Sequence, residues 1–146
     1  MFRSRGLKVT PQRQVIFRVL SSTTHHPTAE AVHAAVRSEL PTISLRTVYQ
    51  SLNDLSAMGE LSALDLGTGS TRFDPTLEPH HHLVCEACGM IEDLHHYFPG
   101  VVLRAPAAER FEVNATEIVF RGRCASCAAH DDTAAAPFPG TRPSEL

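Results

Sequence analysis

The chain has 146 residues, 42% of them apolar, and a formal net charge of -3 at pH 7. This length suits one ordinary domain or two small ones. No apolar run approaches the ~18–20 residues that a membrane span requires, and the first residues contain no apolar signal segment, so we expect no membrane association and a cytoplasmic location. The four cysteines then favour metal binding over disulfide bonds.

The charge is distributed unevenly along the chain. Residues 1–60 hold seven Lys or Arg against four Asp or Glu, whereas residues 61–146 hold six against twelve. A basic N-terminal part can meet phosphate, while an acidic part rich in His and Cys can meet cations. Because many solvated helical faces carry a similar excess, the charge alone does not identify a partner.

Three short amphipathic helices are predicted in the first 60 residues. Each follows a Thr or Ser that can cap a helix N-terminus, and apolar residues recur behind each cap at helical spacing. The three caps are Thr10, before a helix near 11–22 that has Pro11 at its first position; Thr28, before a helix that Pro41 ends; and Ser44, before a helix that Gly59 ends. Tight connections between three such helices suggest a helix-turn-helix.

A β-hairpin is predicted directly after the helices. LSALDLG and TRFDP are short alternating runs around the turn TGS, and helices followed by a hairpin make a winged helix. The third helix of such a unit enters the major groove, where polar side chains contact bases and phosphates. The alternative is that these residues belong to an ordinary solvated helix. The candidate DNA contacts are Arg13, Ser44, Arg46, Thr47, Tyr49 and Gln50.

A second unit is predicted after a proline-bounded hinge. HLVCEA and MIEDL indicate a strand pair, the segment near 98–109 a short helix, and RFEV and EIVFRGRC two further strands. The Pro- and Ala-rich end is typical of a disordered tail. The predicted organisation is a winged-helix DNA-binding domain over 1–74, a hinge over 75–79, a metal-binding dimerisation domain over 80–128 and a tail over 129–146.

Two CxxC motifs predict a structural zinc site. Cys85 and Cys88 form one motif, and Cys124 and Cys127 form the other. Each motif directs two thiolates to one point, and four thiolates make a closed tetrahedral site for Zn²⁺ without an open position. The intervening segment is long, so a sheet must bring the motifs together. A redox-switched dithiol pair is the alternative interpretation.

The histidine run HHH predicts a separate, exchangeable site. On a strand, His80 and His82 share one face while His81 faces away. Asp74 and Asp93 can add oxygen ligands, and such a mixed set suits Fe²⁺ or Mn²⁺ better than a thiolate cage does. The alternative is an exposed polar run. If a histidine of His25-His26-Pro27 reaches the same ion, the metal joins the two halves of the chain and makes DNA binding metal-dependent.

The combination resembles the ferric uptake regulator family of bacterial repressors. RGLKVTPQRQVIF, HPTAEAVHAAV, ISLRTVYQSLNDLSAMGEL, STRFDP, HHHLVCEACGMIEDL and CASC carry the resemblance over roughly residues 5–128. The family implies an α+β fold: an N-terminal winged helix-turn-helix followed by a small α/β dimerisation domain with a four-cysteine zinc site. It also implies a homodimer that binds A·T-rich, pseudo-palindromic operators in double-stranded DNA when metallated.

Within the family the chain is most similar to the peroxide-sensing branch. That resemblance implies that Fe²⁺ at the regulatory site reacts with hydrogen peroxide and that the product oxidises His26 or His80. Mn²⁺ supports repression without this chemistry, and such a protein is not an enzyme because nothing turns over. Glu92 adjoins Asp93, so either acid is a candidate, although alignment from Cys88 favours Asp93. The ligands implied for the regulatory metal are His26, Asp74, His80, His82 and Asp93.

Two other functions stay open at this point. The first is an iron, zinc or nickel uptake regulator of the same family without peroxide sensing. The second is a zinc-ribbon hydrolase or redox protein that uses the open His/Asp site for catalysis, against which the TVYQSLNDL helix and the hairpin argue. His95 and His96 are candidates for a further site.

Overall fold

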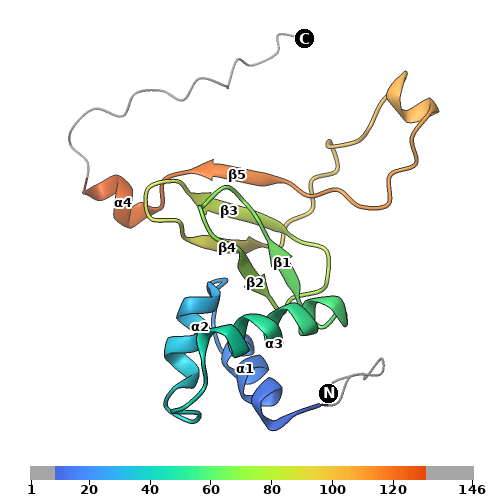
Figure 1. Ribbon diagram of the computed structural model, residues 1–146. Coiled ribbons are helices and arrows are strands. Elements are labelled where there is room, and N and C mark those ends of the chain that lie inside the picture. The colour runs from blue at the N-terminus through green and yellow to red at the C-terminus, as the bar shows by residue number, and fades with distance from the viewer. Residues whose placement is uncertain (1–8, 131–146) are drawn as a thin grey trace.

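The computed structural model describes residues 9–130 and has an α+β fold (Figure 1). Three helices lie below a two-stranded hairpin, and a three-stranded sheet lies above them. No helix among the described residues is long and apolar enough to cross a membrane. The elements are α1 Pro11–Ser21, α2 Ala29–Val36, α3 Leu45–Ala57, β1 Ser62–Leu64, β2 Arg72–Asp74, β3 His81–Cys85, β4 Ile91–Leu94, the 3₁₀ helix η1 Ala107–Glu109, β5 Val119–Gly122 and α4 Ala125–Ala129.

The three predicted caps are confirmed at the N-termini of α1, α2 and α3. Each cap residue has an extended backbone, and its hydroxyl oxygen accepts a hydrogen bond from the amide three residues later. These bonds join Arg13 N to Thr10, Ala31 N to Thr28 and Thr47 N to Ser44, at 3.1–3.3 Å. The starts of the helices therefore follow from local sequence.

The predicted end of α3 is confirmed, whereas the predicted end of α2 is not. After α3, Gly59 has φ +73°, and the bonds from Gly59 N to Ser56 O and from Glu60 N to Leu55 O are both 3.0 Å. This pair of bonds is the Schellman arrangement, which needs a residue without a Cβ at that φ. The prediction that Pro41 ends α2 is wrong by several residues. The helix stops at Val36, and the chain then forms a turn in which Glu39 N donates a hydrogen bond to Val36 O. This turn precedes Leu40, whose backbone the following proline restricts to an extended conformation.

The main apolar core lies between the helices and the hairpin. Its members come from the three helices, the connections after α2 and α3, and β2, and none is more than 7% exposed: Ile16, Leu20, Ala29, Val32, Val36, Ile43, Val48, Leu52, Leu55, Leu61 and Phe73. Full burial of a large aliphatic or aromatic side chain stabilises a fold by about 1.5–3 kcal/mol. Because Phe73 of β2 belongs to this core, the hairpin is fixed to the helices as the wing of a winged helix.

The three-stranded sheet has the order β4-β3-β5. Strand β3 is antiparallel to β4 and parallel to β5. The register places His82 between Asp93 and Val119 in one cross-strand row, and Leu83 between Glu92 and Phe120 in the next. Because successive residues on a strand face opposite sides, these two rows project from opposite faces of the sheet.

The predicted strand RFEV is wrong. Residues 110–113 lie in the long connection from β4 to β5, which extends away from the sheet in Figure 1. Phe111 is 67% exposed and Val113 is 46% exposed. A strand needs a hydrogen-bonded neighbour, and within residues 9–130 none pairs with this segment. The short helix predicted near 98–109 is present as η1, and most of the predicted tail, residues 131–146, lies outside the described residues.

Candidate metal centres

Five buried or half-buried side chains converge between the helices and the sheet. They come from the loop before α2, the end of β2, the run leading into β3, and β4: His26, Asp74, His80, His82 and Asp93. Each offers one ligand atom, and these atoms all lie within 4.8 Å of one another. The structure thus brings together all five residues that the sequence suggested for a regulatory metal.

Strand register decides which residues of the run face this cluster. His82 lies directly opposite Asp93, and His80 precedes it by two residues on the same face. His81 faces the other side, where its Nδ1 accepts a hydrogen bond from Ile118 N at 3.0 Å. Glu92 lies opposite Leu83, also on that other face. Asp93 and not Glu92 therefore belongs to the cluster.

The loop that carries His26 is fixed to the wing. Phe73 N donates to Pro27 O at 3.1 Å, and the Arg72 guanidinium donates to His26 O at 3.1 Å. The same guanidinium donates to Gly89 O at 2.8 Å, in the turn of the first CxxC motif. Arg72 thereby connects the histidine loop with the cysteine cluster. The sequence gives no sign of this role, because both acceptors are backbone carbonyls distant in the chain.

The distances within the cluster fit a coordination shell. His80 Nε2 lies 3.0 Å from Asp74 Oδ2 and 3.1 Å from Asp93 Oδ1, and His82 Nε2 lies 3.8 and 3.6 Å from the same atoms. His26 Nε2 lies 2.6 Å from Asp93 Oδ1. Ligands at ~2.0–2.2 Å from an ion are neighbours at about 3 Å from one another. Three nitrogens and two carboxylate oxygens are a donor set that suits borderline divalent ions.

Asp74 carries an unsatisfied buried oxygen that faces the histidines. Its side chain is 1% exposed, and Oδ1 accepts a hydrogen bond from Thr76 N at 2.7 Å. Oδ2 forms no hydrogen bond of acceptable geometry, although His80 Nε2 is close to it. A buried carboxylate oxygen without a partner is costly unless a cation compensates it. This atom therefore fits a metal centre better than a purely structural cluster.

Two histidines are oriented from outside the cluster. His80 Nδ1 lies 2.6 Å from Glu78 O, and His82 Nδ1 lies 2.8 Å from Glu117 Oε1. Acceptors at Nδ1 direct the Nε2 lone pair of each ring toward the cluster. Burial opposes protonation of His80, but the Glu78 carbonyl and the carboxylates of Asp93 and Asp74 outweigh it, so the pKa of His80 is raised. Glu117 was not among the residues predicted for the site, because its only signal in the sequence is an acidic residue ahead of the last strand.

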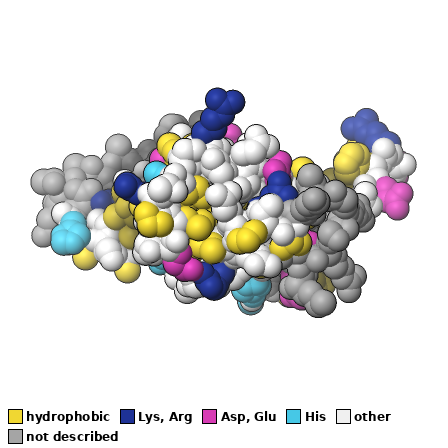
Figure 2. Space-filling model, turned by 60° about the horizontal axis from the view of Figure 1, so that its bottom comes forward, with side chains coloured by type: hydrophobic (Ala, Val, Ile, Leu, Met, Phe, Trp, Pro, Cys, Tyr) yellow, Lys and Arg dark blue, Asp and Glu magenta, His cyan; other side chains and the backbone are white. Residues whose placement is uncertain are grey.

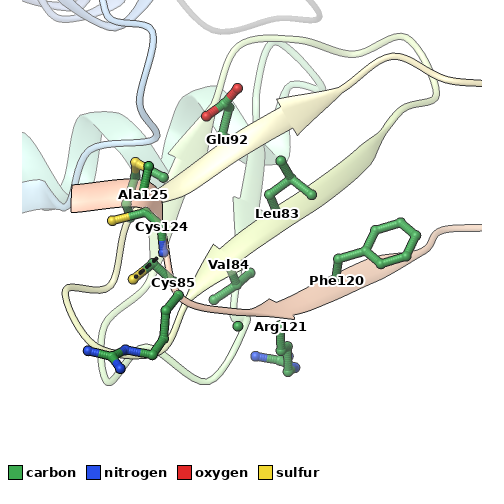
Figure 3. A pocket seen from close by; sticks show the side chains of 11 residues that line it. Leu83, Val84, Cys85, Glu92, Phe120, Arg121, Cys124 and Ala125 are labelled. Carbon is green, nitrogen blue, oxygen red and sulfur yellow. Dashed lines mark hydrogen bonds between the residues drawn. The ribbon is translucent and has the colours of Figure 1, made fainter. Parts of the chain in front are cut away.

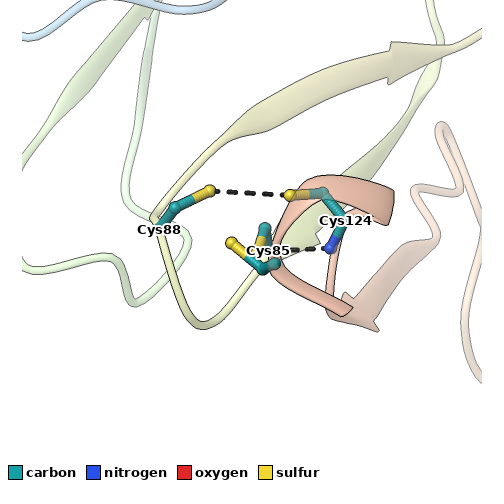
Figure 4. A group of neighbouring side chains, drawn as sticks. Cys85, Cys88 and Cys124 are labelled. Atoms are coloured by element: carbon teal, nitrogen blue, oxygen red, sulfur yellow. Dashed lines mark hydrogen bonds between the residues drawn. The ribbon is translucent and has the colours of Figure 1, made fainter. Parts of the chain in front are cut away.

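The four cysteines form a second cluster at the other end of the sheet (Figure 4). Cys85 ends β3, Cys124 caps α4, and their ligand atoms lie with those of Cys88 and Cys127 within 4.8 Å. Cys88 Sγ lies 3.9 Å from Cys124 Sγ, close to the edge of about 3.8 Å that a tetrahedron with ~2.3 Å zinc–sulfur bonds requires. The geometry suits one tetrahedral ion.

The protonation of the metal-free cysteine cluster is uneven. Hydrogen bonds from the backbone amides of Cys124 and Cys88 lower the pKa of Cys85 to about 6. Hydrogen bonds with the sulfur atoms of Cys124 and Cys88 raise the pKa of Cys127 to about 12. A thiolate at Cys85 therefore forms first, and a cation that binds all four sulfurs must displace the proton of Cys127.

A shallow hollow of about 360 Å³ adjoins the cysteine cluster (Figure 3). Leu83, Glu92 and Phe120 project from one face of the sheet, whereas Val84 and Arg121 project from the other. Phe120 is 46% exposed on the outer face. This face lies opposite the His/Asp cluster and is partly apolar.

Most of the candidate DNA contacts already have partners within the protein. Arg13 forms an ion pair with Asp54, Gln50 donates to Asp54 at 2.9 Å, and Tyr49 donates to Glu30 at 2.7 Å. Figure 2 views the helical side, where Lys and Arg side chains are scattered among uncharged ones and form no continuous patch in this view. The remaining candidates are Ser44 and Thr47, which hydrogen-bond each other at the start of α3, and the exposed Arg46.

The further site considered at His95 and His96 does not form in the described residues. His95 Nε2 is 3.9 Å from Asp93 Oδ2, and its ring packs against His80. His96 packs against Phe98. Neither belongs to a group of metal-ligating side chains between residues 9 and 130.

A winged helix joined to a small sheet, with a His/Asp cluster between them and a four-cysteine cluster beyond, is the architecture of a DNA-binding protein with two sites suited to metal ions. The sequence profile described as the ferric uptake regulator family matches residues 4–121. The chain belongs to this family.

The proteins that the chain resembles include peroxide-responsive regulators and ferric uptake regulators. The chain is 36% identical over 126 residues to the peroxide-responsive repressor PerR of Staphylococcus epidermidis, covering 86% of this chain and 84% of that protein. It is 35% identical to PerR of Staphylococcus aureus, with 86% and 85% covered. Among solved structures, the Campylobacter jejuni peroxide stress regulator has a TM-score of 0.60 at 28% identity, covering 80% and 89%. The Helicobacter pylori ferric uptake regulator has a TM-score of 0.66 at 22% identity, covering 84% and 83%, which shows the shared fold.

Proposed function

We propose that the protein is a metal-dependent transcriptional repressor whose five-residue cluster is the regulatory metal centre. The observation that supports this most directly is that the donors come from both halves of the chain. His26 and Asp74 belong to the winged-helix half, whereas His80, His82 and Asp93 belong to the sheet half. An ion bound by all five favours the arrangement in which the halves are close, and it can shift the equilibrium only by its preference for that arrangement.

The two clusters have different roles in this proposal. The cysteine cluster offers four soft sulfur donors and no open position, so it holds Zn²⁺ permanently and stabilises the sheet half. The His/Asp cluster offers harder, mixed donors and takes Fe²⁺ or Mn²⁺ reversibly. The protein has no substrate to turn over and is not an enzyme.

The partners in this proposal are double-stranded DNA and a second copy of the chain. A homodimer presents two α3 helices to the two half-sites of an A·T-rich, pseudo-palindromic operator. The exposed apolar side chains of the β4–β5 connection and of β5 support dimerisation through the sheet half. They include Val101, Val102, Leu103, Phe111, Val113 and Phe120, which are 44–67% exposed. In the dimer, residues 110–113 would gain a strand partner, which they do not have within residues 9–130.

The finer proposal is peroxide sensing, which the similarity to the PerR proteins of two staphylococci supports. Fe²⁺ held by these five residues would supply the one-electron chemistry that splits hydrogen peroxide. Overall, one peroxide would yield one water, a ring carbon of His26 or His80 would gain the other oxygen atom, and the iron would undergo no net change. An oxidised ring is a poor ligand, so the link between the halves is lost and the target genes for peroxide defence are expressed.

Operator binding with and without peroxide tests this function. We expect zinc-loaded protein to bind the operator only when Fe²⁺ or Mn²⁺ is added, and peroxide to abolish binding only with Fe²⁺. Mass spectrometry should then find one added oxygen on the peptide that contains His26 or His80. Binding with Fe²⁺ that survives peroxide would instead favour an iron, zinc or nickel uptake regulator. Operator binding that does not depend on any of these metals would contradict both functions.

A further inference from the structure

Glu117 contacts the His/Asp cluster but is not one of its five members. Its Oε1 lies 2.8 Å from His82 Nδ1, although the two residues are 35 positions apart. The Glu117 side chain is 49% exposed, whereas that of His82 is 3% exposed. A solvent-facing carboxylate thus reaches a buried histidine ring.

The parallel pairing of β5 with β3 fixes this contact. His82 N donates to Ile118 O at 3.0 Å, and Ile118 N donates to His81 Nδ1, also at 3.0 Å. These two bonds hold both backbone polar groups of Ile118, the residue directly after Glu117. The side chain therefore approaches His82 from a rigid position at the start of the strand, which is the arrangement that precise orientation of a ligand requires.

The contact determines which nitrogen of His82 carries the proton. An ionised carboxylate only accepts hydrogen bonds, so Nδ1 must be the donor and Nε2 keeps its lone pair. Nε2 is the atom that faces Asp93 Oδ1 at 3.6 Å and Asp74 Oδ2 at 3.8 Å. His80 has only a neutral carbonyl acceptor, from Glu78, at the corresponding nitrogen. Of these two rings, His82 alone has a negatively charged acceptor at Nδ1 that makes its Nε2 more basic.

We propose that Glu117 is a positioning residue of the regulatory metal centre, which fixes the tautomer and orientation of His82 and so strengthens metal binding. This inference rests on the proposed function, since it requires that the five-residue cluster binds a divalent ion. Glu117 itself does not ligate the ion, because its carboxylate lies behind the ring of His82.

Titration of the zinc-loaded full-length protein with Mn²⁺ tests the role of Glu117. We expect Glu117→Ala to weaken Mn²⁺ binding by about 10- to 100-fold, the usual effect of losing such a supporting group. Glu117→Gln keeps an oxygen that can accept from Nδ1 but loses the charge, so it should recover much of the lost affinity. Glu112→Gln, on the same connection, is the matched control and should bind Mn²⁺ like the wild type. Equal affinity of Glu117→Ala and wild type would overturn the inference.

A second readout does not depend on the regulatory metal. Nitrogen-15 NMR of the zinc-loaded protein without Mn²⁺ should show His82 protonated at Nδ1 in the wild type and in Glu117→Gln, and a mixture of tautomers in Glu117→Ala. A His82 tautomer that is the same in all three proteins would overturn the inference. Failure of the wild type to bind Mn²⁺ would overturn the proposed function instead, while the tautomer measurement would still report on Glu117.

Discussion

Replacing Asp74 by Asn separates two effects of a buried carboxylate. The Asn side chain has nearly the same shape, and its amide oxygen can keep the hydrogen bond from Thr76 N. The substitution removes the negative charge at Oδ2, which has no hydrogen-bond partner of acceptable geometry. Because an uncompensated buried charge is costly, the metal-free variant should be as stable as the wild type or more stable. The same change removes an anionic ligand, so metal binding should become much weaker.

The size of the effect follows from ligand linkage. Mn²⁺ at 100 times its dissociation constant stabilises the folded protein by about 2.7 kcal/mol. A change of 1 kcal/mol shifts the Tm of a chain of this size by about 2–4 °C, so the wild type should gain roughly 5–11 °C. If Asp74→Asn weakens binding about 100-fold, the same Mn²⁺ concentration adds only about 0.4 kcal/mol, or about 1 °C.

Scanning calorimetry of zinc-loaded protein, with and without Mn²⁺ at pH 8, measures both effects. Asp65→Asn is the matched control, because Asp65 is exposed and its Oδ1 likewise accepts a backbone hydrogen bond two residues on, from Gly67 N at 3.3 Å. The control should gain as many degrees with Mn²⁺ as the wild type. An unchanged Mn²⁺ shift in Asp74→Asn would refute the assignment of Asp74 to the metal centre.

Four further predictions concern pH, zinc, helix capping and DNA binding. The pKa of His80 is raised above its ordinary value of 6.5, and only the neutral ring binds metal. As the pH is lowered, Mn²⁺ affinity should therefore start to decrease before pH 6.5 is reached and then drop by about tenfold per pH unit, which calorimetric titration can measure. An affinity that stays constant down to pH 5 would contradict this. Cys124→Ser should abolish stoichiometric zinc binding and unfold the sheet half, since a structural zinc contributes about 10–16 kcal/mol of binding free energy to folding. Zinc analysis and circular dichroism measure these two effects. A folded variant, with no zinc in the wild type, would instead indicate a cluster that is only redox-active. Ser44→Ala should cost about 1 kcal/mol of stability by removing the α3 cap, and so lower the Tm by about 2–4 °C. Arg46→Ala should leave the Tm unchanged. It should reduce by about 1 the salt slope of operator binding, which is the slope of log affinity against log salt concentration. An unchanged salt slope would exclude a phosphate contact by Arg46.

The helical half could be predicted from the sequence because its signals are local. Thr10, Thr28 and Ser44 each cap the helix that follows, by accepting a hydrogen bond from the amide three residues later. The choice of Asp93 over Glu92 rested on the alignment with the family from Cys88, because strand alternation shows only that the two acids face opposite sides; the cross-strand pairing of Asp93 with His82 agrees with this choice. Local patterns thus sufficed for the winged helix, whereas the full set of cluster members, and the choice of His26 over His25, depended on the resemblance to the family.

The features that the sequence did not predict depend on distant parts of the chain. Residues 110–113 have the composition of a strand, but composition does not supply a neighbour for it. Arg72 and Glu117 support the metal centres through a backbone carbonyl and a ring nitrogen that lie 46 and 35 positions away. Nothing in the residues beside them in sequence indicates these contacts, which arise only when the wing and β5 take their places.

The central claim is that one ion joins the two halves. Operator binding by His26→Ala at saturating Mn²⁺ tests it most directly, because this variant lacks one of the two donors from the winged-helix half. The variant keeps four donors, so the metal still binds at higher concentration and its occupancy can be verified by electron paramagnetic resonance. Fluorescence anisotropy should show that Mn²⁺ stimulates operator binding by the wild type, and that fully occupied His26→Ala is stimulated much less, because only Asp74 still joins the winged-helix half to the ion. Equal stimulation of the two proteins at full occupancy would contradict the claim that the ion acts by linking the halves.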